Sequence, residues 1–184
     1  MIALRFIVPY GLGMRDVTLQ LAELSDKPLI EGLMQFYIYD FSEMEPDGSH
    51  DLDFPPDGRF NPYPYLPDYW VEAGRVPLII RVDGKPAGFA LINRFSHFGG
   101  EIERNMGEFF VARKFRRDGI AREALRQVLA AYPGRWEVAV AARNHRALAF
   151  WPKAIAAAPN ASDLVRREGD GEHWIGPIWC FSAG

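Results

Sequence analysis

Residues 101–132 constrain the fold more than any other part of the sequence. An apolar run ending in EFFVA passes into a turn with several basic residues around Gly119, and a regular amphipathic pattern follows. Pro133 and Gly134 end that pattern, and a second apolar run covers residues 135–141. This order predicts one strand–helix–strand unit. The apolar face of the predicted helix consists of Ile120, Ala121, Ala124, Leu125, Val128 and Leu129.

The remaining periodic segments predict a mixed α+β domain with the order β-α-loop-β-β-β-α-β-α-β-β. The DGK sequence at residues 83–85 is typical of a hairpin turn. Helix starts are indicated by Pro28 in a first turn and by Asn144 as a cap, whereas Pro152 should bend or end the helix that it interrupts. The expected strands cover residues 17–24, 77–82, 87–94, 101–112, 135–141, 164–168 and 173–181, and the expected helices cover residues 25–41, 119–132 and 144–157.

Residues 43–67 differ in character from the segments on either side. They contain six prolines and two glycines, a density that excludes regular hydrogen-bonded structure. The same segment is rich in phenylalanine and tyrosine, which is unusual for a free linker. We therefore predict a long ordered loop over residues 43–70 that packs on the domain, and loops of this length are often functional.

The length of 184 residues fits one domain with its own core. We assign residues 15–184 to that domain and expect residues 1–14 to be an N-terminal extension, because the first strand pattern begins after Met14. Cys180 is the sole cysteine, so no internal disulfide can form and a reducing, cytoplasmic compartment is expected. No segment approaches the roughly 20 apolar residues that a membrane span needs, so no membrane association is expected.

The charges are distributed unevenly along the chain. A net charge of −3 is opposite in sign to the footprint of a nucleic-acid-binding domain. Residues 40–57 hold seven acidic side chains and no lysine or arginine, whereas residues 113–122 hold five basic side chains and one acidic one. This asymmetry indicates two partners or two parts of one ligand, unless both segments are merely solvated.

The basic turn has the features of a phosphate-binding site. The first N–H groups of a helix lack internal partners and carry the positive end of the helix dipole. Gly119 has no Cβ, so an anion can approach those amides closely. Arg116, Arg117 and Arg122 can add charge-assisted hydrogen bonds. The alternative is an ordinary helix start with a cationic face. The P-loop and dinucleotide-binding patterns are both absent from the sequence.

Two motifs at the expected separation resemble the GNAT superfamily of N-acetyltransferases. Residues 116–121, RRDGIA, are similar to its acyl-CoA-binding pattern R/Q-x-x-G-x-G/A, and Val111 and Phe115 match the apolar and aromatic positions before it. Residues 144–151, NHRALAFW, resemble the downstream pattern N-x-x-A-x-x-x-Y/F. The order of elements fits over residues 15–182. Within the superfamily, the two stretches resemble a subgroup of mostly uncharacterised predicted acetyltransferases.

The resemblance implies a GNAT-like acyl-CoA N-acyltransferase fold, with a central mixed, mostly antiparallel sheet and helices on both faces. It implies acetyl-CoA as the donor and an amine as the acceptor, which attacks directly in a ternary complex. The pantetheine arm would enter a gap between the strand ending at Val111 and the strand of residues 137–140. The implied cofactor-binding residues are Phe110, Val111, Ala112, Arg116, Arg117, Asp118, Gly119, Ile120, Ala121, Asn144 and Phe150.

Acetyl transfer to an amine needs a base, because only a neutral amine attacks the thioester. Glu108 is the first candidate for this catalytic role, and Glu103 is the second. Strand alternation places Glu108 on the same side as Phe110 and Ala112. The alternative is that Glu108 is an exposed or ion-paired strand residue.

The family's usual thiolate-protonating tyrosine is replaced here by Trp151. An indole N–H can donate a hydrogen bond but does not release a proton at working pH. Trp151 is a candidate site residue that could cover the CoA sulfur or shape the acyl pocket, or it could be a plain core aromatic. The proton for the leaving thiolate would then come from water, from the departing ammonium group, or from Tyr37, Tyr39 or Tyr69.

The loop of residues 43–70 corresponds to the segment that covers the acceptor in the family. Its carboxylates would attract a cation and its aromatic rings could bind one over their faces, which favours a cationic amine, a polyamine, a basic peptide or an aminoglycoside-like acceptor. A solvated acidic loop on aromatic anchors is the alternative. The residues concerned are Asp40, Glu43, Glu45, Asp51, Asp53, Tyr63, Tyr65, Tyr69 and Trp70.

Three functions stay open from the sequence. The first is an active N-acetyltransferase, and the second is an acyl-CoA-binding module that has lost catalysis, as Trp151 suggests. The third is a small nucleic-acid binder that uses the basic turn, against which the net charge argues. A single cysteine and scattered histidines give no support for a metal site. The resemblance leaves a homodimer open.

Overall fold

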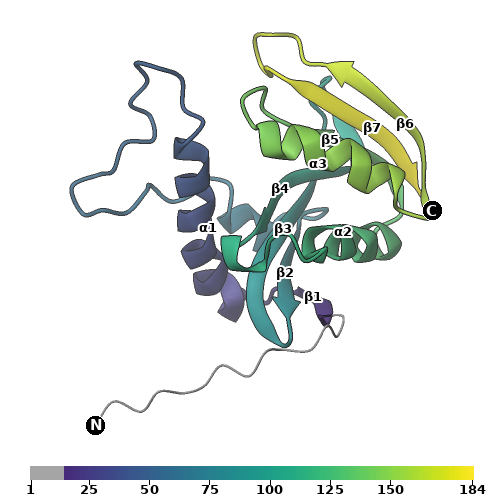
Figure 1. Ribbon diagram of the computed structural model, residues 1–184, viewed down its shortest axis with the longest axis horizontal. Coiled ribbons are helices and arrows are strands. Elements are labelled where there is room, and N and C mark those ends of the chain that lie inside the picture. The colour runs from purple at the N-terminus through teal and green to yellow at the C-terminus, as the bar shows by residue number, and fades with distance from the viewer. Residues whose placement is uncertain (1–14) are drawn as a thin grey trace.

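The computed structural model describes residues 15–184, so the predicted extension at residues 1–14 lies outside the described residues. The elements follow the predicted order along the chain (Figure 1). The strands are β1 (Val17–Leu21), β2 (Val76–Val82), β3 (Lys85–Phe95), β4 (Glu101–Val111), β5 (Gly134–Ala139), β6 (Ala161–Glu168) and β7 (Pro177–Ala183). The helices are α1 (Lys27–Ser42), α2 (Ile120–Ala131) and α3 (His145–Ala156), with short 3-10 turns η1 (Leu24–Asp26), η2 (Pro67–Trp70) and η3 (Arg113–Phe115).

The strands form one sheet in the order β1-β2-β3-β4-β5-β7-β6. Every neighbouring pair is antiparallel except β4 and β5, which are parallel. Parallel neighbours require a crossover connection, and α2 provides it. The predicted mixed, mostly antiparallel sheet is confirmed, together with the strand–helix–strand unit.

Helices cover both faces of this sheet, as expected. Phe89 of β3 packs with Ile30 and Met34 of α1 on one face. The next residue, Ala90, packs in the core that contains Leu125 of α2 and the apolar side of α3. Side chains alternate along a strand, so α1 lies on the opposite face from α2 and α3. In Figure 1 the β6–β7 hairpin, in yellow, lies beside α3.

β4 and β5 diverge after a short paired region, and we call this divergence the fork. The two strands pair only at Arg104↔Trp136 and Asn105↔Glu137. β4 nevertheless continues to Val111 and stays paired with β3 on its other side. The β5 side of residues 106–111 therefore has no neighbouring strand, and its backbone polar groups can bond a guest.

A β-bulge at Gly107 determines which side chains of β4 face α1. The register between β3 and β4 slips by one residue there. After the slip, Glu108 and Phe110 lie on the α1 side, as alternation predicted. A Cβ at Gly107 would come within 2.6 Å of Asn93 Nδ2 and 2.9 Å of the Tyr69 hydroxyl oxygen, so the bulge is closely surrounded.

The segment between α1 and η2 is an ordered loop, as predicted. Residues 43–66 contain no helix or strand, and Phe60 and Leu66 are buried. Gln35 of α1 fixes the loop, because its Nε2 donates to the Phe60 carbonyl at 3.2 Å and its Oε1 accepts from the Phe60 N–H at 2.9 Å. In Figure 1 the loop extends past the C-terminal end of α1.

Several strand boundaries differ from the prediction, since β1 ends at Leu21, β5 ends at Ala139 and β6 begins at Ala161. α3 runs through Pro152 to Ala156, so the proline does not end that helix. β7 begins at Pro177, later than expected. The physical reason is the Asp170 carboxylate, which accepts backbone N–H groups from residues 172–174 at 2.8–3.1 Å and folds the segment into a loop.

Gly88 tests how closely β3 and β4 approach each other near the fork. An added Cβ would lie 1.9 Å from the Phe110 carbonyl oxygen, and backbone cannot move aside cheaply. We expect Gly88→Ala to lower the free energy of unfolding by about 1–3 kcal/mol. Gly32→Ala is the control, because a Cβ there meets nothing within 4 Å in α1 and should stabilise the helix by about 0.5–1 kcal/mol. Urea unfolding measures both, and equal stabilities would contradict the close approach.

Candidate functional site

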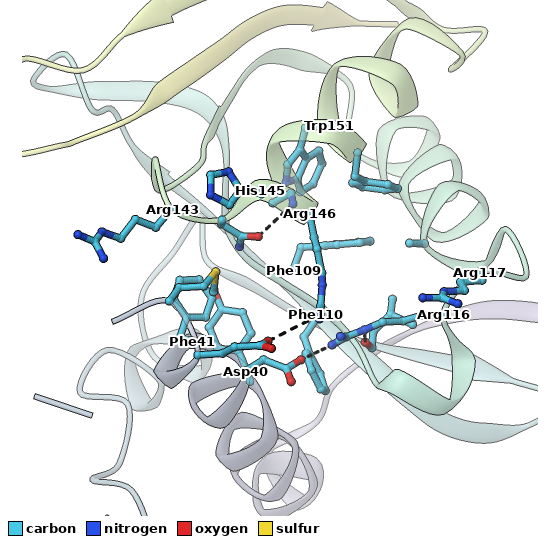
Figure 2. Close-up of a pocket in the computed structure, with 18 of the residues that line it drawn as sticks. Asp40, Phe41, Phe109, Phe110, Arg116, Arg117, Arg143, His145, Arg146 and Trp151 are labelled. Carbon is cyan, nitrogen blue, oxygen red and sulfur yellow. Dashed lines mark hydrogen bonds and ion pairs between the residues drawn. The ribbon is translucent and has the colours of Figure 1, made fainter. Parts of the chain in front are cut away.

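A cavity of about 890 Å³ opens where four chain segments meet. Its walls are the C-terminal end of α1 with the residues after it, the end of β4, the start of α2 and the start of α3. In the view of Figure 2, Arg116 and Arg117 lie at one end, and Arg143 lies at the other. This volume is within the range of small-molecule and cofactor sites.

The start of α2 presents a run of unpaired backbone N–H groups to this cavity. The first helical hydrogen bond joins the Glu123 N–H to the Gly119 carbonyl at 3.0 Å. Within residues 15–184, the amides of residues 117–122 donate no hydrogen bond, and no side chain caps the helix. Arg117 and Gly119 have φ values of 78° and 77°, in the left-handed region of backbone conformation. Such an arrangement is suited to a phosphate group.

Arg116 holds the basic turn together. Its Nε donates to the Val111 carbonyl at 2.7 Å, and its Nη2 donates to the Asp40 carboxylate. The other oxygen of Asp40 accepts from Arg113 Nε at 2.8 Å. The carboxylate therefore ties α1 to the end of β4 through two arginines, as Figure 2 shows for Arg116.

Arg117 and Arg122 are the cations of the turn that remain available. Both line the cavity, and neither forms an ion pair within the described chain. Asp118, in contrast, contacts Arg15 at 3.5 Å and does not line the cavity. An anionic ligand at the start of α2 would meet these two free guanidinium groups beside the unpaired amides.

The start of α3 forms a second polar wall. The Asn144 side chain caps the helix by accepting the Ala147 N–H at 3.0 Å, which confirms the predicted cap. Arg143 and Arg146 line the cavity beside it. Glu43 lies 3.7 Å from Arg146, so the residues after α1 approach this wall.

Three aromatic rings form the apolar wall between the two basic ends. Phe109 of β4 stacks near Phe150, with ring centroids 6.3 Å apart, and lies 5.3 Å from Trp151. Trp151 is 6% exposed and belongs to the core of α2 and α3, yet it also lines the cavity. Its indole N–H makes no hydrogen bond within residues 15–184 and is not sealed from solvent. Trp151 is therefore both a core residue and part of the cavity wall.

Glu108 lies behind the cavity wall. Tyr37 lines the cavity and donates its hydroxyl hydrogen to Glu108 Oε2. Burial raises the pKa of Glu108, and hydrogen bonding by Tyr37 and Tyr63 offsets only part of that shift. Burial and the Glu108 charge raise the pKa of Tyr37, which stays a neutral phenol. The raised pKa moves the ionisation of Glu108 toward neutral pH.

A polar network connects the α1 face to the fork. Asn105 is the last residue of β4 that pairs with β5, and its Nδ2 donates to Asn93 Oδ1 at 2.9 Å. Asn93 Nδ2 in turn donates to the Tyr69 hydroxyl at 3.1 Å. Burial raises the pKa of Tyr69, and the nearby charge of Glu108 adds to the shift. This hydrogen-bonded network therefore runs from the fork to Tyr69, which lies within the electrostatic reach of Glu108.

The second candidate base does not reach the cavity. Glu103 is exposed and accepts from Arg135, from the backbone N–H at 2.7 Å and from Nε at 3.3 Å. Trp70, named for cation binding, donates its indole N–H to the Ala22 carbonyl at 3.0 Å and anchors the loop instead. Tyr65 is exposed.

Most of the residues predicted from the sequence meet at the cavity. Those that line it are Phe110, Val111, Arg116, Arg117, Gly119, Ile120, Ala121, Asn144, Phe150 and Trp151, whereas Ala112, Asp118 and Glu108 do not. Sequence reasoning missed Asp40 as a partner of the basic turn and missed the wall made by Phe41, Met44 and Arg143. The helical spacing of Tyr37, Asp40 and Phe41 was a signal that these side chains share one end of α1.

Two kinds of feature are absent from residues 15–184. No three histidine, cysteine, aspartate or glutamate side chains in this range gather as metal ligands would. No helix in it is both long enough and apolar enough to cross a bilayer.

Comparison with known proteins agrees with this geometry. The sequence model described as "Acetyltransferase (GNAT) family" matches residues 38–155, which include the end of α1, β4, α2 and most of α3. No curated protein matches the chain.

Solved structures show the same fold at low identity. An acetyltransferase from Thermus thermophilus is 14% identical, with a TM-score of 0.60 over 91% of this chain and 97% of that one. The PaiA N-acetyltransferase of Thermoplasma acidophilum, solved with coenzyme A, is 8% identical, with a TM-score of 0.57 over 92% and 99%. The ribosomal-protein-S18-alanine N-acetyltransferase of Escherichia coli is 14% identical, with a TM-score of 0.54 over 91% and 93%.

The arginines of the basic turn should separate into binding and structural residues. Arg117→Ala and Arg122→Ala should each weaken the binding of inorganic pyrophosphate, because those side chains are free, and should change stability by less than about 0.5 kcal/mol. Arg116→Ala should lower the free energy of unfolding by about 1–2 kcal/mol, because it leaves Asp40 and the Val111 carbonyl without that donor. Calorimetry and urea unfolding measure the two effects. Loss of binding only in the Arg116 variant would contradict this division.

Proposed function

The chain belongs to the GNAT family of acetyltransferases, and on that premise we propose that it transfers an acetyl group from acetyl-CoA to a primary amine by direct attack. The observation that carries this proposal is the run of unpaired amides at residues 117–122 beside the fork. Together they offer a phosphate site and an unpaired strand edge within one cavity.

The donor is proposed to bind along both features. Its diphosphate would lie on the amides of residues 117–122, with Arg117 and Arg122 adding charge-assisted hydrogen bonds. Its pantetheine arm would run into the fork and bond the free edge of β4 near Val111. The acetyl group would then lie by Phe109 and Phe110, beneath the Trp151 ring. Gly119 supports this placement, because the position where its Cβ would stand meets nothing within 4 Å and is open to a ligand.

Catalysis in such a site relies on positioning and on removal of one proton. Holding the amine against the thioester in the cavity supplies a large part of the rate. Backbone N–H groups near Val111 would polarise the thioester carbonyl. Glu108 is the proposed proton acceptor, because it is a carboxylate of raised pKa beside the cavity wall. Its pKa shift moves the ionisation toward the working pH, where a general base is most effective.

The acceptor is proposed to be cationic. Glu45 and Asp47, in the segment after α1, bring two carboxylates to the cavity lining. A smaller cavity of about 210 Å³ in the loop is lined by Asp51, Asp53 and Tyr63, which could hold a second positive group. A lysine side chain or a polyamine satisfies both features, whereas an acidic amine would be repelled.

A second candidate function is an acyl-CoA-binding module without catalysis. Trp151 favours it, because it stands where the family's tyrosine acid is expected and offers no ionisable hydroxyl. The two functions differ in one observable, since a binding module would take up acetyl-CoA and release no thiol with any amine.

Replacement of Glu108 tests the catalytic proposal. We expect Glu108→Gln to lower kcat by about 10²–10⁴-fold, because the proton acceptor is lost, while affinity for CoA is retained. The wild-type kcat/KM should rise with pH as Glu108 ionises, above the usual range for a glutamate, and the variant should lack that rise. Thiol release from acetyl-CoA gives the rates. Glu103→Gln, an exposed glutamate on the same strand, is the matched control, and equal losses in both would dismiss Glu108.

The preference for a cationic acceptor can be tested by comparing amines of opposite net charge. Spermidine and lysinamide should be acetylated with a kcat/KM at least about tenfold above that of glutamate, because the acidic side of the cavity attracts cations. The preference should weaken as ionic strength rises. Thiol release at low and high salt measures both effects. Faster acetylation of glutamate would show that the acidic residues do not select the acceptor.

A further inference from the structure

Tyr37 separates Glu108 from the cavity in which transfer is proposed. Tyr37 is among the residues that line the cavity, whereas Glu108 is not. The hydroxyl of Tyr37 donates to Glu108 Oε2, so Tyr37 connects that carboxylate to the cavity lining. An acceptor bound in this cavity would meet the phenol before it met the carboxylate.

The ring of Tyr37 is fixed by aromatic packing. Its centroid lies 4.8 Å from that of Phe41, 5.8 Å from Phe89 and 6.0 Å from Phe110. These contacts come from α1, β3 and β4, so three elements set the position of the hydroxyl. A phenylalanine at this position would keep the packing and lose only the oxygen.

The other ionisable groups around the pair do not provide a competing path. Tyr63 and Tyr69 come from the loop side, and Arg75 lies near Tyr69, with its guanidinium 5.3 Å from that ring. Asp40, one turn along α1, is already bound to Arg113 and Arg116. Tyr63 also hydrogen-bonds Glu108, but it lines the smaller loop cavity, and none of Tyr63, Tyr69 and Arg75 lines this one. Trp151 does line it, but its N–H does not ionise at working pH.

We propose that Tyr37 is a catalytic residue, which takes the proton from the acceptor nitrogen and passes its own to Glu108. This inference rests on the proposed function and assigns Glu108 an indirect role as a positioning residue and proton store. The phenol never becomes a phenolate, because it gains one proton as it loses another. Its resistance to ionisation is therefore no obstacle.

The step balances in atoms and electrons. A bound ammonium ion first gives one proton to solvent, which leaves the neutral amine. The amine nitrogen then forms a bond to the thioester carbon, the carbon–sulfur bond breaks, and its electron pair goes to sulfur. The nitrogen proton moves to the Tyr37 oxygen while the Tyr37 proton moves to Glu108 Oε2. The same transfers in reverse then carry a proton to the sulfur. The products are the amide and the CoA thiol, with Tyr37 neutral and Glu108 ionised as before. No external acid is needed, which accounts for the absence of a tyrosine at Trp151.

A double-mutant cycle tests the relay in the full-length protein. The variants are Tyr37→Phe, Glu108→Gln and both together, assayed by thiol release with whichever of spermidine and lysinamide the wild type acetylates faster. If the two residues form one path, each single variant should lose about 10²–10⁴-fold in kcat. The double variant should lose no more than the worse single one. The rise of kcat/KM with pH that belongs to Glu108 should vanish in Tyr37→Phe as well.

Two measurements distinguish a catalytic role from a structural one. The dissociation constant for CoA and the urea midpoint of Tyr37→Phe should stay close to the wild-type values. Tyr132→Phe is the control, because its hydroxyl makes no hydrogen bond within residues 15–184 and lies outside the cavity lining. It should retain wild-type turnover.

Several outcomes would overturn the inference. They are turnover of Tyr37→Phe within about twofold of wild type, losses that multiply in the double variant, or a loss explained by weaker CoA binding or lower stability. Turnover by Tyr37→Phe that keeps the Glu108 pH dependence would also refute it. Absence of wild-type turnover with both amines is a different failure. It would refute the proposed function, and the relay with it.

Discussion

The early separation of β4 from β5 is the constraint on which the rest of the site depends. Two residue pairs join the strands, and from Met106 onward β4 is held only by β3. An unpaired edge inside a sheet leaves backbone groups unsatisfied unless a ligand bonds them. Here that edge forms a wall of the cavity, so the defect in the sheet and the binding site coincide.

The fork is supported from the α1 face of the sheet. Asp40 of α1 binds Arg113 and Arg116, and Arg116 holds the Val111 carbonyl, so the end of β4 has a fixed position without β5. The bulge at Gly107 turns Glu108 toward the same helix. The start of α2 lines the same cavity as the open edge of β4. The arginines of the basic turn, the open backbone edge and the Glu108 carboxylate therefore all lie toward one end of β4.

The sequence predicted the parts of the site that lie close together in the chain. The glycine in the basic turn and the Asn144 cap are local signals, and the apolar face of α2 follows a regular period. Pairings between distant segments were not predictable, because no local pattern links Asp40 to Arg116 or Tyr37 to Glu108. The same limit applies to Trp70, which was predicted to bind a cation because it follows the proline-rich loop. Its indole N–H instead donates to the distant Ala22 carbonyl, and no local pattern links these two residues. α3 extends past Pro152, as the predicted range of residues 144–157 allowed, because packing of α3 on the sheet outweighs one missing backbone hydrogen bond.

Hydrogen exchange of the protein with and without CoA tests the central claim most directly, because it reports on individual amides. If the diphosphate lies at the start of α2 and the pantetheine arm lies in the fork, the amides of residues 117–122 and the open edge of residues 106–111 should exchange more slowly at saturating CoA. Unchanged exchange in both segments, or protection confined to other parts of the chain, would contradict the account.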